Sequence, residues 1–362
     1  EVLQINIKYN FKKIIYFFKE NIENFFSKKY TNIHLITDGA SWACDKTTED
    51  ISKFFKQLNP NTKISLFPPK KQYVYYSDQY SILKGKFYKR QNIVCLDYQH
   101  GQIKYIKNNR KLLSFVLKHQ SKINLIRVTN SFFRDYLIKK GIKKNKIIQI
   151  PITIDTQKFK PLKNKKYYKK KFKLPEDKIL IGSFHKDGNG WGQGNEPKLI
   201  KGPDTLVKTL IDLNKKIGLK KICVVLTSPA RGYVKKQLKK NNIEFKHFYP
   251  LEDFEIPLLF NCLDIYLIAS RDEGGPRGLF EAMACGIPVI STLVGHAHDY
   301  IKNGHNGFRS PIEDFESLSS NILKVIRNKN LKEKIIKNSI KTAQLNNFKS
   351  HLKYWKNFYN QL

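Results

Sequence analysis

The chain has 362 residues, a length that suits two domains of roughly 150 to 200 residues better than one. Its hydrophobic content of 41% is sufficient for packed cores, and no apolar run approaches the ~18 residues that a membrane span needs. The formal charge is +37, from 67 basic and 30 acidic residues. This charge either reflects a lysine-rich coding bias or draws the protein towards polyanions such as anionic lipid, nucleic acid or sugar nucleotides.

The five cysteines are scattered, mostly inside apolar runs, and no C-x-x-C pattern occurs. We therefore expect reduced core cysteines in a cytoplasmic protein. The first residues, EVLQINIKYNFKK, lack the long apolar core and the small-residue cleavage site of a signal peptide.

The first predicted element is an amphipathic helix over residues 10–29, where phenylalanine and isoleucine recur at helical spacing with lysines between them. Two interpretations are open. The helix packs on the domain that follows, which we favour, or it lies on an anionic membrane surface, led by Lys12, Lys13 and Lys19.

Short runs of β-forming residues then alternate with helical patterns, which predicts an α/β protein with parallel sheets. We expect strands over residues 32–37, 63–67, 72–76, 92–96, 123–129, 146–150, 178–184, 221–227, 243–249, 264–269 and 287–291. We expect helices over residues 45–58, 107–118, 131–140, 252–262, 276–285, 313–329, 331–344 and 347–360, with a further helix after Asp204. The Lys-rich run 156–174 is interpreted as a linker and the start of a solvated helix.

Two corners between a strand and a helix contain glycine. The first strand ends in Asp38-Gly39, but a full G-x-G-x-x-G is absent, so a nicotinamide site is not indicated. The strand 178–184 is followed by a long glycine-rich loop with Lys186, and Lys201-Gly202 precede the next helix. This second corner is not a P-loop, because no G-x-x-x-x-G-K-[ST] is present.

The most informative stretch is 270–308. A polar glycine loop follows the strand 264–269, Pro276 stands where a helix can begin, and Gly286 ends that helix. Such a corner suits a phosphate, because free N–H groups and the helix dipole meet there. Glu273 and Glu281 flank it, and carboxylates accept hydrogen bonds from neutral hydroxyls, as on a ribose or a hexose.

Glu273 and Glu281 are separated by seven residues, and the second lies in EAMACGIPVIST. This block resembles the E-x7-E signature of the GT4-type (glycosyl transferases group 1) retaining glycosyltransferases with the GT-B fold. The alternative is an ordinary buried βαβ unit with a surface Glu pair. The resemblance implies two Rossmann-like domains facing across a cleft. We expect an acceptor domain at 1–155, completed by a C-terminal helix in 346–362 that crosses back to it, and a donor domain at 156–345.

The resemblance implies a hexosyltransferase-type enzyme that moves a sugar from a UDP- or GDP-linked donor to a glycan or lipid-linked acceptor. We expect no metal and no other cofactor, since no D-x-D occurs and the histidine cluster 296–299 has no third ligand motif. The alternatives are a sugar-nucleotide epimerase of the same architecture and a non-enzymatic polyanion-binding protein. No pattern indicates specific nucleic-acid binding. We expect the protein in the cytoplasm, with peripheral contact at an anionic membrane as its further partner.

The resemblance also implies roles for individual residues. Glu273 would bind hydroxyls of the donor sugar, and Lys186 and Lys201 would face the diphosphate, with Lys186 standing approximately where the family has Arg. Glu281 would bind the ribose. His100, which with Gly101 matches a His-Gly common in the family, would face the acceptor and the reacting sugar together with Asp38 and Gly39. The main chain of the donor corner is Gly275, Pro276, Arg277, Gly278 and Leu279.

Overall fold

A computed structural model describes residues 30–39, 43–84, 91–99, 101, 107–218 and 220–362. The predicted amphipathic helix 10–29 and His100 lie outside these residues. The chain divides into two compact units: unit 1 comprises Glu1–Ile150 with His351–Leu362, and unit 2 comprises Pro151–Ser350. The boundaries between the units therefore lie at 150/151 and 350/351. The boundaries expected from the sequence are 155/156 and 345/346.

Among the described residues, unit 1 contains a six-stranded parallel sheet in the order β2-β1-β3-β4-β5-β6. Its strands are β1 (Ile33–Ile36), β2 (Thr62–Ser65), β3 (Tyr73–Tyr76), β4 (Ile93–Tyr98), β5 (Leu125–Val128) and β6 (Ile147–Gln149). Its helices are α2 (Ala43–Leu58), α3 (Lys107–His119), α4 (Ser131–Lys139) and most of α13 (Phe348–Tyr359). Because all the strands are parallel, their carboxyl ends lie at one edge of the sheet.

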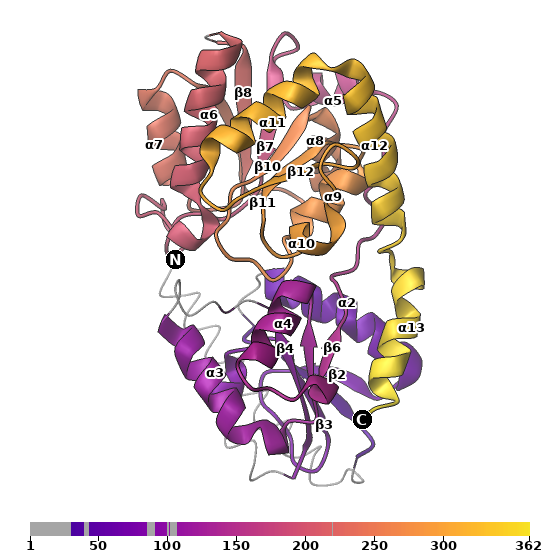
Figure 1. Cartoon of the computed structure of the whole chain (residues 1–362). Helices are drawn as coiled ribbons and strands as arrows, with labels where there is room; N and C mark the ends of the chain where they lie inside the picture. The colour runs from indigo at the N-terminus through magenta and orange to yellow at the C-terminus, as the bar shows by residue number, and fades with distance from the viewer. Residues whose placement is uncertain (1–29, 40–42, 85–90, 100, 102–106, 219) are drawn as a thin grey trace. The chain divides into compact units, whose positions relative to one another are not determined.

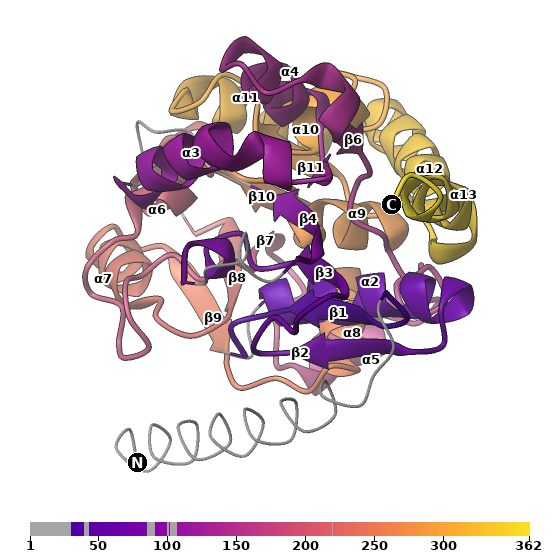
Figure 2. The same ribbon diagram turned by 90° about the horizontal axis from the view of Figure 1, so that it is seen from below.

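The two faces of this sheet are covered by different helices. Val74, Leu96 and Ile126 pack against α3 and α4, which Figure 2 shows together on one side of the strands. On the other face, Trp355 of α13 stacks on Phe54 of α2 with ring centroids 5.6 Å apart. The last helix of the chain therefore contributes to the core of unit 1.

A buried ion pair lies beneath α13. Arg127 on β5 donates from Nη1 to Oδ2 of Asp97 at 2.8 Å and from Nε to the carbonyl oxygen of Ile150 at 2.8 Å. Its guanidinium lies 5.1 Å from the ring centroid of Trp355. Burial, with a smaller contribution from the Arg127 charge, lowers the pKa of His351 on α13 to about 4. The guanidinium thus holds both the end of β6 and the C-terminal helix on unit 1.

Unit 2 contains a second sheet. In the residues of this unit that the structure describes, which are all but 219, the sheet has six strands in the order β12-β11-β10-β7-β8-β9. Its strands are β7 (Ile179–Ser183), β8 (Ile222–Thr227), β9 (Glu244–Phe248), β10 (Ile265–Ile268), β11 (Val289–Thr292) and β12 (Phe308–Ser310). Its helices are α5 (Lys165–Lys171), α6 (Pro203–Ile217), α7 (Gly232–Lys240), α8 (Glu255–Cys262), α9 (Arg277–Ala284), α10 (Ala297–Tyr300), α11 (Phe315–Arg327) and α12 (Lys329–Gln344).

Helices cover both faces of this sheet as well (Figure 1). Val224 and Leu226 of β8 pack towards α6, α7 and α11, while the alternate residues Cys223 and Val225 pack towards α8 and α9. This alternation is the two-residue period of a strand buried on both sides. The predicted α/β class with two parallel sheets is confirmed.

Most predicted elements are present with small shifts at their ends. The Lys-rich run 156–174, interpreted as a linker and the start of a solvated helix, lies within unit 2 and contains α5, in which no residue is buried. The residue after this helix, Phe172, is buried against Phe248 with ring centroids 5.5 Å apart. The cysteines whose side chains the structure describes are buried free thiols, as predicted: Cys95, Cys223, Cys262 and Cys285.

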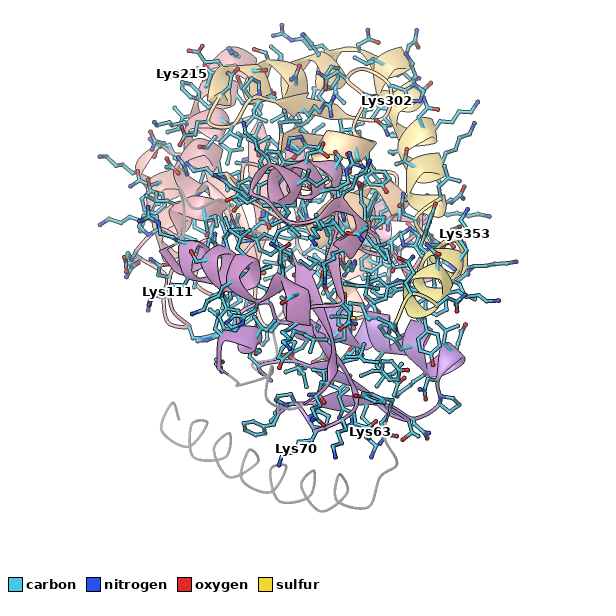
Figure 3. All side chains as sticks on the ribbon, turned by 60° about the horizontal axis from the view of Figure 1, so that its bottom comes forward. Lys63, Lys70, Lys111, Lys215, Lys302 and Lys353 are labelled. Atoms are coloured by element: carbon cyan, nitrogen blue, oxygen red, sulfur yellow. The ribbon has the colours of Figure 1, made fainter. Side chains whose placement is uncertain are left out.

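The lysines are spread over many elements. Lys63, Lys70, Lys111, Lys215, Lys302 and Lys353 are all exposed and project from strands, loops and helices of both units (Figure 3). Over the described part of the chain, no helix has the length and apolar character needed to cross a membrane.

Candidate functional site

The predicted donor corner lies at the carboxyl end of β10. The buried strand is followed by the loop 269–276, and α9 begins after Pro276, whose extended backbone turns the chain into the helix. Gly286 ends α9 with φ +73, and its N–H donates to the carbonyl oxygen of Met283 at 3.1 Å. The sequence thus builds a strand, a loop and a helix, so the positive end of the α9 dipole lies at the carboxyl end of β10.

Lys201 and Glu273 meet at this corner. The Nζ atom of Lys201 lies 2.7 Å from both carboxylate oxygens of Glu273, although the two residues are 72 positions apart. Gly202 makes the approach possible: a Cβ there would lie 1.8 Å from the carbonyl oxygen of Ala269, and its φ is +62. The Lys-Gly pair recognised in the sequence therefore brings the ammonium group to the end of β10.

Glu273 is a buried, ionised carboxylate with 6% of its surface exposed. Burial alone would raise its pKa, but the charge of Lys201 and hydrogen bonds from Lys201 and from Ser270 Oγ at 2.9 Å hold the pKa below its usual range. Burial lowers the pKa of His185 to about 4, so its imidazole is neutral at pH 7. The corner therefore combines a cation, an anion and a neutral imidazole.

A second ion pair fixes the loop around Glu273. Arg271 donates from its two terminal nitrogens to the two carboxylate oxygens of Asp204, at 2.7 and 2.6 Å. The same guanidinium donates to the carbonyl oxygen of Leu199 at 2.6 Å and pairs with Glu313. Because these contacts join the loop after β10 to the turn that carries Lys201, the Lys201–Glu273 pair is held from both sides.

The remaining residues of the predicted donor corner lie at the start of α9. The Nε atom of Arg277 is 3.7 Å from Oε1 of Glu281, one turn along the helix. A Cβ on Gly278 would lie 2.2 Å from the hydroxyl oxygen of Tyr266, so only glycine lets the first turn of α9 approach β10 this closely. A Cβ on Gly275 would lie 2.5 Å from His296, and Leu279 is fully buried with its N–H bonded to the Pro276 carbonyl oxygen at 3.0 Å.

Lys186 lies on the long loop that follows β7. Its Nζ atom is 4.3 Å from the ring centroid of Trp191, an exposed residue at the tip of the same loop. Burial lowers the pKa of Lys186. The base of the loop is held by Arg231, a buried residue whose Nε lies 2.9 Å from Oδ1 of Asp187. The structure therefore defines the position of this loop, which the sequence leaves open.

The candidate residues of unit 1 follow β1. Gly39 has φ +67, and its N–H donates to Oγ1 of Thr37 at 3.3 Å. Asp38 is half-buried, and the hydroxyl of Thr37 also donates to Asp45 on α2. Asp38 and Gly39 therefore lie just after β1, next to the hydrogen bonds that Thr37 makes.

In the part of the chain that the structure describes, no group of three or more His, Cys, Asp or Glu side chains is arranged to hold a metal ion. His296 from the 296–299 cluster is fully buried, packs on Phe280 with ring centroids 4.7 Å apart, and accepts a hydrogen bond from the N–H of Ile152 at 3.3 Å. His296 therefore has a packing role.

Sequence reasoning gave no role to His185, Arg231 or Arg271. Arg271 lies two residues before Glu273, inside the stretch 270–308 that carries the family resemblance, so its position alone indicates a place near the site. Its partner Asp204 is 67 residues away in the sequence, so no local pattern links the two residues. Arg231 stands in an unremarkable Pro-Ala-Arg-Gly turn, and nothing in that turn indicates that its side chain is buried.

The segment that contains Lys201, Glu273 and Glu281 is similar to known proteins. Residues 197–342 match the family model for glycosyl transferases group 1. An uncharacterised glycosyltransferase of Methanocaldococcus jannaschii, MJ1069, is 25% identical over 63% of this chain, and the match spans 56% of that relative's length. The chain therefore spans little more than half of this curated relative.

Two solved structures are similar along most of their length. HepE of Anabaena in complex with UDP-glucose has a TM-score of 0.73 at 15% identity, covering 91% of this chain and 99% of that one. The sucrose-phosphate synthase of Thermosynechococcus elongatus has a TM-score of 0.73 at 14% identity, covering 91% and 98%. At these identities the likeness concerns the fold, and the predicted GT-B fold is confirmed.

Proposed function

Because residues 197–342 of this chain belong to the glycosyl transferases group 1 family, we propose that the protein is a glycosyltransferase. It moves a sugar from a nucleotide-diphospho-sugar to a hydroxyl group of a glycan or lipid-linked acceptor. The reaction retains the configuration at the anomeric carbon and uses no metal ion or other cofactor.

The observation that carries this proposal is the Lys201–Glu273 pair at the start of α9, with 2.7 Å between the charged atoms. Cleavage of the bond between sugar and phosphate places negative charge on the departing diphosphate. Lys201, Lys186 and the positive end of the α9 dipole are the groups that stabilise this charge. Glu273, kept ionised, accepts hydrogen bonds from hydroxyls of the donor sugar.

We assign the ribose of the nucleotide to Glu281, whose carboxylate lies one helical turn from the phosphate-binding end of α9. The UDP-glucose complex of HepE favours a UDP-linked donor, with GDP-linked donors as the second group to test. We assign acceptor recognition to unit 1, with Asp38, Gly39 and His100 as the residues to substitute.

We propose that the enzyme works in the cytoplasm. Its acceptor there would be a glycan or a lipid-linked molecule. Contact with an anionic membrane through Lys12, Lys13 and Lys19 would be peripheral, and each lysine near the surface contributes about 1 kcal/mol at low salt. Sedimentation with anionic vesicles tests this contact. Protein that stays in the supernatant at low salt contradicts it.

The purified chain should be incubated with a panel of UDP- and GDP-sugars, and release of the nucleoside diphosphate should be measured. We expect slow hydrolysis of one donor and binding in the micromolar range typical of such substrates. Proton NMR of the released sugar should show the anomer of the donor. Absence of binding and of hydrolysis with every donor contradicts the proposal, and an epimerised nucleotide sugar formed without acceptor would identify an epimerase instead.

A further inference from the structure

Three successive carbonyl groups at the end of β7 are held by one short segment after β8. Arg231 donates from Nη1 to the carbonyl oxygens of Ser183 and His185, both at 2.6 Å, and Oγ of Ser228 donates to the carbonyl oxygen of Phe184 at 3.0 Å. We call the segment Ser228–Arg231 the carbonyl clamp. It fixes the main chain that leads directly into Lys186.

The clamp also holds the residue that follows Lys186. Asp187 is 2% exposed, and its Oδ1 lies 2.9 Å from Nε of Arg231, which is 1% exposed. The carbonyl oxygen of Asp187 accepts the N–H of Lys198 at 2.7 Å, which closes the loop. Lys186 therefore stands between two residues, His185 and Asp187, that are both tied to one buried guanidinium.

The far side of the loop contacts the clamp and Gly232, the residue that follows it. The N–H of Gly232 donates to the carbonyl oxygen of Gln193 at 2.7 Å, and a Cβ on Gly194 would lie 2.1 Å from the carbonyl oxygen of Ala230. Ser228 and Ala230 have φ of +71 and +57, a region that is unfavourable for a non-glycine residue. Such strain persists where the surrounding structure enforces it, and here it aims two donors at the end of β7.

We propose that the carbonyl clamp is a positioning element for catalysis, in which Arg231 sets the geometry of Lys186 and His185 at the donor site. This inference rests on the proposed glycosyl transfer. Arg231 is buried and does not touch the substrate; it acts through the main chain of its neighbours. The role needs a planar guanidinium, because one group must reach two carbonyl oxygens and a carboxylate at once.

The test compares Arg231→Lys and the milder Asp187→Asn with two controls. Glu244→Gln removes the ion pair with Lys178, just before the opposite end of β7. Leu180→Ala removes a buried side chain in the middle of β7 and controls for lost stability. For each variant, kcat, the donor KM, the melting temperature and hydrogen exchange of residues 184–198 are measured.

We expect Arg231→Lys to lower kcat about 100-fold, the loss that follows a displacement of about 1 Å at a reacting group. KM should rise much less than kcat falls, because the charge that Lys186 stabilises grows in the transition state. Asp187→Asn should lower kcat about tenfold, and exchange of residues 184–198 should accelerate in both variants. Glu244→Gln should behave as the wild type.

A kcat of Arg231→Lys within twofold of the wild type overturns the proposal, as does an equal loss of kcat in Leu180→Ala at the same fall in melting temperature. If the wild type turns over no donor, the proposed function fails. Hydrogen exchange alone then tests whether Arg231 fixes the main chain around Lys186. Unchanged exchange of residues 184–198 in Arg231→Lys then overturns it.

Discussion

Replacing Lys201 with methionine should expose how strongly the donor corner depends on one ion pair. The pair is 2.7 Å long, and its carboxylate is 6% exposed. At an effective dielectric constant of about 20, two charges at this distance attract by about 6 kcal/mol, part of which offsets their desolvation. Removing one partner of a buried pair costs about 3–5 kcal/mol. Because Lys201 is itself 23% exposed, we expect the low end, about 3 kcal/mol.

The double variant Lys201→Met with Glu273→Gln separates the charge effect from lost packing. An uncharged glutamine needs no ammonium partner, so we expect the double variant to lose only about 1 kcal/mol, less than Lys201→Met alone. Both variants should lack donor hydrolysis. Urea unfolding should be followed by hydrogen exchange of peptides from β10 and α9, since two units need not unfold together.

The effect should also depend on pH with a defined sign. The pKa of Glu273 lies below its ordinary value of 4.5, so the pair stabilises fully above that pH and its contribution is lost as the pH falls through the lowered pKa. The deficit of Lys201→Met should therefore shrink in acid. A deficit below about 0.5 kcal/mol at pH 7, or a double variant as unstable as the single one, would refute this reasoning.

Three further outcomes are expected. Glu281→Ala should weaken nucleotide binding about tenfold by removing one hydrogen-bond acceptor for the ribose, and unchanged affinity in calorimetry removes its assigned role. Donor binding should draw Lys186 away from Trp191 and change the tryptophan fluorescence; Trp191→Phe should abolish that change, and a signal that survives the substitution places its origin elsewhere. Because burial lowers the pKa of His351 to about 4, stability should fall between about pH 6.5 and 4, and His351→Gln should reduce that fall; an identical pH profile contradicts it.

The features that were predictable are local in sequence. The β10–α9–β11 unit shows a buried run, a glycine loop, Pro276 at the start of the helix and Gly286 at its end, and each has one physical interpretation. The role of Lys201-Gly202 instead follows from its resemblance to the family pattern. The structure adds the reason why residue 202 is glycine: a Cβ there would clash with the carbonyl oxygen of Ala269.

The features that were missed depend on distant partners. The guanidinium of Arg231 lies against residues 183–187, and such pairings leave no periodic signal in one sequence. Helix α7 was not predicted, because its apolar contacts with the sheet depend mainly on Val234 and Leu238, too few to establish a helical period. The loop that bears Lys186 is rich in glycine, so its course is set by the clamp rather than by local preference.

Hydrogen exchange with and without saturating nucleotide sugar tests the central claim most directly, because it locates the donor on the chain. The account predicts slower exchange in residues 183–202 and 270–284, which carry Lys186, Lys201 and Glu273, with no change in the Lys-rich helix α5. Protection confined to α5, or absent from both stretches under conditions of proven binding, would contradict a donor site at the start of α9.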